Sequence, residues 1–314
     1  MEMHGVSPIS VLRSSRIKWR IGRITFWMNR FRSLPRANSL FQDVEPGTVL
    51  SRPLFGHKLF CDVSREGPQR LLFLEGERHV PEARLLLGLL KRGFRVVDVG
   101  ANIGYYMLLF SKGIGTEGNI IAIEPSPENL PELLLNVERN SLRNNIKVLA
   151  TAVGSAKGVV GLKEGINSGV TSGGDAAYSV QIDTLDNLIK DRVDFIKIDV
   201  EGFESFVLKG AADIISKWRP FLFVELHPVE VRQHGISIID VVQQLQRLYS
   251  KIELYELPEK GGLFDSVLRR YFGIGPTREV NDVHEYISQV TFQDSARPFW
   301  AVCRPEFCVG VNQI

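Results

Sequence analysis

Cysteine is scarce in this sequence, whose 314 residues include only Cys61, Cys303 and Cys308. The number is odd, and the three are not spaced like the paired ligands of a structural zinc site. A reducing compartment is therefore the expected environment. Long apolar runs are also absent, since nothing approaches the roughly 20 residues of a membrane-spanning helix. The start lacks the continuous apolar core of a secretory signal. Together these absences predict a cytoplasmic protein.

Acidic residues are nearly absent from the N-terminal end. Residues 1–42 hold eight Arg or Lys and one acid, Glu2, whereas the rest of the chain holds thirty basic and thirty-five acidic residues. The basic character is therefore local and does not describe the whole protein. We divide the chain into a basic N-terminal arm, residues 1–45, and a mildly acidic main domain, residues 46–314.

Apolar residues in the arm recur every three or four positions, which places them on one face of a helix. They are Ile17, Ile21, Ile24, Met28 and Phe31. This spacing predicts an amphipathic helix that packs its apolar face on the main domain. The basic flanks and two tryptophans also suit contact with an anionic membrane surface, and the Arg- and Ser-rich composition suits a targeting peptide. Nucleic-acid binding is not expected, because no nucleic-acid-binding motif accompanies the basic residues.

Strands and helices alternate through the main domain. A β-hairpin is predicted over 47–63, with helices over 81–91, 105–111, 128–140, 203–218 and 236–249. Strands are predicted over 94–100, 119–125, 146–154, 193–200, 220–228, 250–257 and 297–305, with a further strand and helix within 180–190. Apolar strands that alternate with helices predict an α/β fold, with a mostly parallel sheet covered by helices on both faces.

Carboxylates follow the predicted strands where the strands end. They are Asp98, Glu124, Asp199, Glu201 and Glu225. Because ligands bind at the carboxyl edge of a parallel sheet, we expect these side chains to converge on a binding site. A phosphate would be repelled there, whereas S-adenosylmethionine carries an ammonium, a sulfonium and a ribose diol and has no phosphate. The edge therefore favours S-adenosylmethionine as the cofactor.

The glycine turn in VVDVGANIGYY, residues 96–106, agrees with this cofactor. It departs from the G-x-G-x-x-G pattern of dinucleotide sites and places Asp98 before its first glycine. Glycines would let the backbone pass close to the ligand, and Glu124 could accept hydrogen bonds from both ribose hydroxyls. Glu124 falls twenty residues after Gly104, a spacing that would also suit the ribose contact of an NAD protein, so an NAD-dependent oxidoreductase stays an alternative.

Five separated motifs resemble one family. VVDVGANIGYY, AIEPSPENLPELLLNVERN, DTLDNL, FIKIDVEGFESFVLKGA and PFLFVELHP occur in an order and spacing similar to those of the FkbM family of S-adenosylmethionine-dependent methyltransferases. The resemblance covers about residues 75–230 well and the last eighty residues poorly. It implies a class I methyltransferase (Rossmann-like) fold, with a seven-stranded, mostly parallel sheet and a reversed last hairpin.

The resemblance also implies a set of cofactor-binding residues. The methionine side would be lined by Asp98, Gly100, Asn102 and Gly104. Glu124 would bind the ribose, Pro125 and Ser126 would border the adenine, and the strand end near Ala152 would close over the base.

Methyl transfer is expected at the end of the strand IKIDVEGFE. Transfer to oxygen is an in-line displacement that needs alignment, plus a base when the acceptor is an alcohol. Asp199, Glu201 and His227 are the candidate catalytic residues. Structural roles are alternatives: Asp199 could hold the sulfonium end, Glu201 could cap the following helix, and Lys197 could neutralise the acids. No metal is expected, because no second ligand cluster accompanies these residues.

The sequence therefore predicts methyl transfer from S-adenosylmethionine to a hydroxyl of a small natural product, a sugar or a glycan, with the oxygen preference implied by the family resemblance. The alternative is a non-catalytic S-adenosylmethionine-binding protein that docks on a partner or membrane through the arm. The glycine-rich loop over 165–174 could close over the acceptor. Within the C-terminal part, residues 231–314, an acceptor-specific insertion is expected over 261–290. The pattern does not indicate an oligomeric state.

Overall fold

The structure is a computed structural model that describes residues 38–76, 80–163, 169–171, 176–256 and 298–305. The predicted arm helix and the predicted insertion over 261–290 lie outside these residues, as do most positions of the loop over 165–174. Among the helices that are described, none combines the length and the apolar character needed to cross a bilayer.

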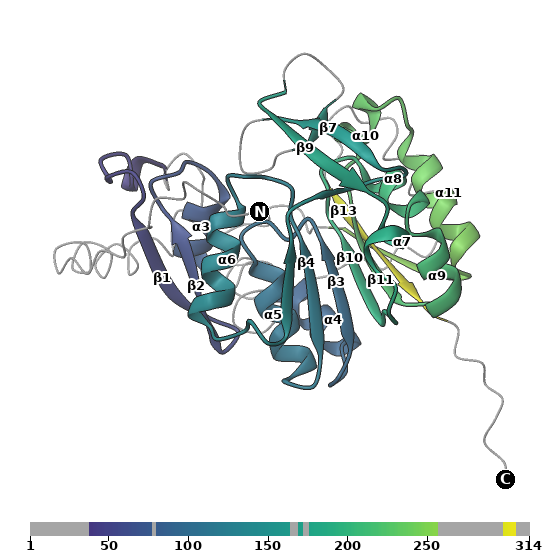
Figure 1. The fold of residues 1–314 in the computed structure, drawn as a ribbon, viewed down its shortest axis with the longest axis horizontal. Helices are drawn as coiled ribbons and strands as arrows, with labels where there is room; N and C mark the ends of the chain where they lie inside the picture. Colours follow the sequence, from purple (N-terminus) through teal and green to yellow (C-terminus); the bar gives the residue numbers. More distant parts are fainter. Residues whose placement is uncertain (1–37, 77–79, 164–168, 172–175, 257–297, 306–314) are drawn as a thin grey trace, which may run out of the picture.

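A seven-stranded sheet forms the centre of the fold (Figure 1). Its strand order is β12-β13-β11-β10-β3-β4-β5. Neighbours from β11 to β5 pair in parallel, and β13 pairs antiparallel with both β11 and β12. The strands are β3 (Arg95–Val99), β4 (Asn119–Ile123), β5 (Ile146–Leu149), β10 (Phe195–Ile198), β11 (Phe221–Leu226), β12 (Lys251–Glu256) and β13 (Phe299–Arg304). The predicted α/β class I fold with a reversed last hairpin is confirmed.

Both faces of this sheet are buried because its strands are apolar at nearly every position. On β3, Val96 belongs to one apolar cluster and Val97 to the other, as expected for side chains that point alternately to opposite faces. The apolar cluster on one face includes residues of α4 (Val80–Leu89), α5 (Tyr105–Ile114) and α6 (Leu130–Arg139), together with α3 (Pro68–Glu75), which contacts the hairpin over residues 49–62. The other face packs on α7 (Leu185–Leu188), α8 (Glu204–Lys209), α9 (Ala212–Trp218), α10 (Pro228–Gln233) and α11 (Ile238–Leu248).

A second sheet of four strands, in the order β6-β9-β7-β8, was not predicted. Its strands are β6 (Ala152–Val153), β7 (Gly158–Leu162), β8 (Val170–Thr171) and β9 (Tyr178–Asp183). The single strand predicted over 146–154 is wrong in this respect, because the chain leaves the main sheet after Leu149 and pairs with β9 instead. The chain therefore has an additional layer beside the ends of the main strands.

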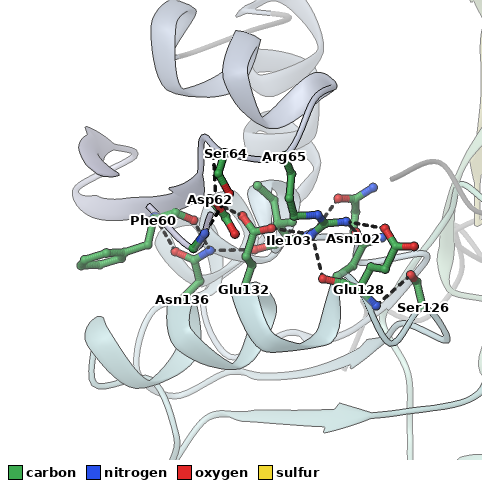
Figure 2. Close-up of polar contacts among 12 residues, drawn as sticks. Phe60, Asp62, Ser64, Arg65, Asn102, Ile103, Ser126, Glu128, Glu132 and Asn136 are labelled. Carbon is green, nitrogen blue, oxygen red and sulfur yellow. Dashed lines mark hydrogen bonds and ion pairs between the residues drawn. The ribbon is translucent and has the colours of Figure 1, made fainter. Parts of the chain in front are cut away.

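The predicted hairpin over 47–63 is confirmed as β1 (Val49–Leu54) and β2 (His57–Asp62), which pair antiparallel. Figure 2 shows how side chains of α6 bind the backbone of β2. Asn136 accepts from the Phe60 N–H at 2.8 Å and donates to the carbonyls of Phe60 at 3.0 Å and Ile103 at 2.9 Å. Glu132 accepts from the Asp62 N–H at 2.8 Å. These bonds satisfy polar backbone groups that an edge strand leaves unpaired.

Replacing Asn136 with alanine should lower the free energy of unfolding by about 2–4 kcal/mol, because it leaves buried backbone groups of Phe60 and Ile103 without partners. Asn140 is a matched control, since it makes the same pair of bonds to Lys58 at an exposed position. Asn140→Ala should cost only about 0.5–1 kcal/mol, because water can replace those bonds. Urea unfolding followed by circular dichroism measures both, and equal costs would contradict the explanation.

Candidate active site

The loop between β3 and α5 adopts a left-handed backbone at three positions. Gly100, Asn102 and Gly104 have φ of 79°, 50° and 96°. A Cβ added to Gly100 would lie 1.8 Å from the carbonyl oxygen of Asp199, at the end of neighbouring β10. The glycine is therefore required by the close approach of two strand ends. The expectation that the glycines also let the backbone pass close to a ligand stays a prediction.

Glu124 follows β4 and organises the loop that faces it. Its carboxylate accepts from the backbone N–H of Asn102 at 2.8 Å, from the N–H of Ser126 at 2.9 Å and from the side-chain amide of Asn129 at 3.3 Å. Burial raises the pKa of Glu124, and these hydrogen bonds oppose the rise. Binding of ribose by Glu124 stays a prediction. The contact of Asn129 with Glu124 was not predicted from the sequence, because an asparagine just before a helix is commonly a helix cap.

Asp98 lies inside the protein and pairs with a lysine. Its side chain is fully buried, and Lys197 Nζ lies 3.3 Å from Asp98 Oδ1 and 3.2 Å from Asp199 Oδ2. Burial opposes the charge on Lys197, but the carboxylates of Asp199 and Asp98 outweigh it and raise the pKa of the lysine. Burial also raises the pKa of Asp98 itself. These contacts agree with the alternative that Lys197 neutralises the acids, and the role of Asp98 on the methionine side of the cofactor stays a prediction.

A cavity of about 360 Å³ opens at the carboxyl edge of the main sheet. Its lining includes these residues that the sequence assigned to the site: Gly100, Asn102, Glu124, Pro125, Ala152, Asp199 and Glu201. Asp98, Gly104, Ser126 and His227 are not among the lining residues. Glu225, one of the carboxylates expected at this edge, also lines the cavity, whereas Tyr106 and Phe203 line it and had not been assigned to it. The cavity therefore joins the Glu124 end of the edge to the Asp199 end.

Asp199, Glu201 and His227 come together at one end of the cavity. His227 Nε2 lies 3.8 Å from Asp199 Oδ1 and 3.6 Å from Glu201 Oε2, and it lies 3.9 Å from Glu225 Oε1. Glu201 has a left-handed backbone, with φ of 51°, which is unusual for a residue other than glycine. Burial raises the pKa of Glu201 to about 7. The predicted juxtaposition of these three residues is therefore present.

Glu204 holds the ring of His227 from behind. It is fully buried, its Oε1 lies 2.8 Å from His227 Nδ1, and the same oxygen accepts from the Gly202 N–H at 3.0 Å. Burial opposes the charge on His227, but Glu204, Asp199 and Glu225 raise the pKa of the imidazole to about 10. Sequence analysis missed Glu204, because a glutamate in the first turn of a helix usually faces water. Glu204 therefore accepts the bond from Gly202 just before α8. The sequence had suggested Glu201 as an alternative residue for capping that helix.

Comparison with known proteins gives a consistent result. The methyltransferase FkbM domain family matches residues 98–255. The hexuronic acid methyltransferase AglP of Haloferax volcanii is 26% identical over 195 residues, which are 60% of this chain and 75% of that protein. Protein-L-isoaspartate O-methyltransferase 1 of Arabidopsis thaliana is 32% identical over 110 residues, 35% of this chain and 48% of that protein. The crystal structure of methyltransferase FkbM from Methylobacillus flagellatus matches with a TM-score of 0.39 and 20% identity, over 72% of this chain and 53% of that one.

Proposed function

Because the chain belongs to the family of methyltransferases with an FkbM domain, we propose that it transfers a methyl group to a hydroxyl oxygen of a sugar, a glycan or a small natural product. The chain is an S-adenosylmethionine-dependent methyltransferase. This membership removes the NAD-dependent oxidoreductase that sequence analysis left open. The identity of the acceptor and the oxygen as the receiving atom are the proposed part.

One observation carries the proposal: a single cavity joins Glu124 to Asp199 and Glu201. A cofactor with its ribose at Glu124 and its methionine part along the Gly100–Asn102 loop would direct its methyl group toward the end of β10. The acceptor would then meet the methyl group beside the two carboxylates. Carboxylates accept hydrogen bonds from hydroxyl groups, so this wall suits a sugar or another polyol.

The transfer itself needs little from the protein beyond alignment. A lone pair of the hydroxyl oxygen forms the new O–CH₃ bond while the S–CH₃ bond breaks, and its electrons neutralise the sulfonium to give S-adenosylhomocysteine. The hydroxyl proton must leave as the bond forms. Asp199 and Glu201 line the cavity and are placed to accept it. His227 lies behind them, in contact range of both carboxylates.

The acceptor class draws support from one relative. The relative AglP of Haloferax volcanii is a hexuronic acid methyltransferase by name, and the alignment spans three quarters of its length. A sugar acceptor is therefore the first class to test. Membrane contact through the arm stays a proposal, since the predicted arm helix lies outside the described residues. The cytoplasmic location likewise stays a proposal that rests on the sequence alone.

Isothermal titration of the full chain with S-adenosylhomocysteine should show micromolar binding, on the order of −8 kcal/mol. NADH serves as the control ligand and should not bind. Labelled methyl groups from S-adenosylmethionine should then be followed into uronic acids and neutral hexoses, with the methylated position located by mass spectrometry. Folded protein that fails to bind S-adenosylhomocysteine at millimolar concentration would refute the cofactor site. Transfer to nitrogen alone would refute the hydroxyl acceptor.

A further inference from the structure

Three potential ligand atoms lie close together at the acidic end of the cavity. The ligand atoms of Asp199, Glu201 and His227 all lie within 4.8 Å of one another. The distances from His227 Nε2 to the two carboxylates, 3.8 and 3.6 Å, are too long for hydrogen bonds. Atoms that each lie about 2.0–2.3 Å from a shared ion are separated by roughly 3–4.5 Å. The spacing is therefore that of ligands around a common centre.

The imidazole of His227 is buried and aimed at that point. Its side chain is 5% exposed, and Nε2 makes no hydrogen bond within the described part of the chain. The ring is fixed through Nδ1, which lies 2.8 Å from the fully buried Glu204. The surrounding carboxylates favour the doubly protonated ring, so a metal ion would have to displace the proton on Nε2. Glu204 at Nδ1 would then direct the lone pair of Nε2 toward the ion, as in carboxylate–histidine–metal groups. This buried, directed nitrogen is an observation independent of the acids.

Negative charge is in excess around the same point. Apart from the imidazole of His227 itself, the buried cation beside this point is Lys197, which is already shared by Asp98 and Asp199. Three further carboxylates face His227, those of Glu201, Glu204 and Glu225. The sulfonium of the cofactor is attracted to this charge, but its sulfur is fully substituted and cannot accept the lone pair of an imidazole nitrogen. A metal cation can satisfy both the charge and the nitrogen.

We propose that Asp199, Glu201 and His227 bind a divalent cation and that Glu204 is a positioning residue for the histidine. One imidazole and two carboxylates suit Mn²⁺ or Zn²⁺ better than Ca²⁺. The sequence predicted no metal, because no second ligand cluster accompanies these residues; the proposal departs from that prediction on the spacing of the three ligand atoms. If the proposed function holds, the ion lies beside the methyl group, where it would take the acceptor hydroxyl as a further ligand and lower the pKa of that hydroxyl.

The test uses the full chain after chelator treatment. Titration with MnCl₂, with free Mn²⁺ measured by electron paramagnetic resonance, should show about one bound ion per chain, displaced by Zn²⁺. Glu204→Gln should weaken binding by about 10–100-fold, since outer partners of a ligating histidine have effects of that size. Asp199→Asn should weaken it at least as much. Glu230→Gln is the matched control, because Glu230 contributes negative charge near Glu201 without donating a ligand atom.

Binding of S-adenosylhomocysteine is measured on the same preparations. Wild-type protein that binds S-adenosylhomocysteine but neither Mn²⁺ nor Zn²⁺ at millimolar concentration would overturn the metal site and leave the proposed function intact. Equal Mn²⁺ affinity in Asp199→Asn and Glu230→Gln would overturn it too. Mn²⁺ binding that depends on Asp199 and Glu204, in protein that does not bind S-adenosylhomocysteine, would support the metal site and refute the proposed function.

Discussion

Replacing Lys197 with methionine should lower the free energy of unfolding by about 3–5 kcal/mol, the cost of removing one partner from a buried ion pair. Lys197 is 1% exposed and contacts Asp98, Asp199 and the carbonyl of Gly100. Its Nζ also lies 4.9 Å from the centre of the Tyr106 ring. Methionine would fill a similar volume, so the loss would come from the carboxylates left without a cation.

Asp98 should account for most of this loss. It faces Lys197 across the register of β3 and β10, and within the described residues neither of its oxygens has a hydrogen-bond partner. Asp199 is partly exposed and can be solvated, whereas Asp98 cannot. The double variant Lys197→Met with Asp98→Asn should therefore recover much of the stability, because no buried charge remains on β3.

Urea unfolding followed by circular dichroism measures the effect. Lys209→Met is the control, since Lys209 is exposed on α8 and should change stability by less than about 0.5 kcal/mol. A similar small change for Lys197→Met would show that Asp98 is protonated in the fold and needs no cation. Failure of the double variant to recover would show that the lysine acts through Asp199.

The regular parts of this fold could be predicted because each carries its own local pattern. Apolar runs at 94–100 and 193–200 have the length and composition of buried strands, and both form. The order of the strands predicted which edge of the sheet holds their carboxyl ends. It also predicted that Glu124, Asp199 and Glu201 converge there, and all three line the cavity. These predictions required only the rule that parallel strands end at one edge.

The second sheet had no comparable pattern. Two of its strands, β6 and β8, contain two residues each, too few for alternation to be visible. The helix predicted over 203–218 is in fact α8 and α9, separated around Gly210. A Cβ at Gly210 would lie 1.9 Å from the carbonyl oxygen of Gly154 in the chain that follows β6. A contact between segments 56 residues apart in the sequence cannot be read from either segment.

The same limit applies to the charges of the site. Asp98 precedes the glycine turn in the sequence, and this position suggested contact with a ligand. Its charge partner in the fold, Lys197, is 99 residues away and is placed by the pairing of β3 with β10. Glu204 is similar, because its burial depends on His227 arriving from the end of β11. Strand pairing therefore determines which carboxylates face the cavity and which are buried beside a positive charge.

Gly100 lines the cavity and also lies against the end of β10. Gly100→Ala should therefore cause one of the largest losses of stability of any single substitution in the chain. A Cβ there would lie 1.8 Å from Asp199 O and 2.9 Å from Asp199 C. These are backbone atoms at a sheet edge, so they cannot rotate away as a side chain could. We expect a loss of at least about 4 kcal/mol in the free energy of unfolding, within the range of severe steric defects.

Gly93→Ala separates the clash from the backbone conformation. Gly93 has the same φ of +79°, but a Cβ added to it would meet nothing within 4 Å. Its substitution should cost only about 1–2 kcal/mol, the price of a left-handed backbone for an ordinary residue. Urea unfolding gives both costs, and titration with S-adenosylhomocysteine gives the effect on the cavity.

Binding should be lost or weakened at least about 100-fold in Gly100→Ala wherever folded protein remains, because relief of the clash must move either the loop before α5 or the end of β10. Gly93→Ala should bind as the wild type does, since Gly93 lies before β3, at the opposite end of the strand from the cavity. Equal stability of the two variants would mean that the backbone at the end of β10 can move to make room for the added Cβ at little cost in free energy. Asp199 would then not be held in place by the strand beside it, and its position at the cavity would have to come from Lys197 alone.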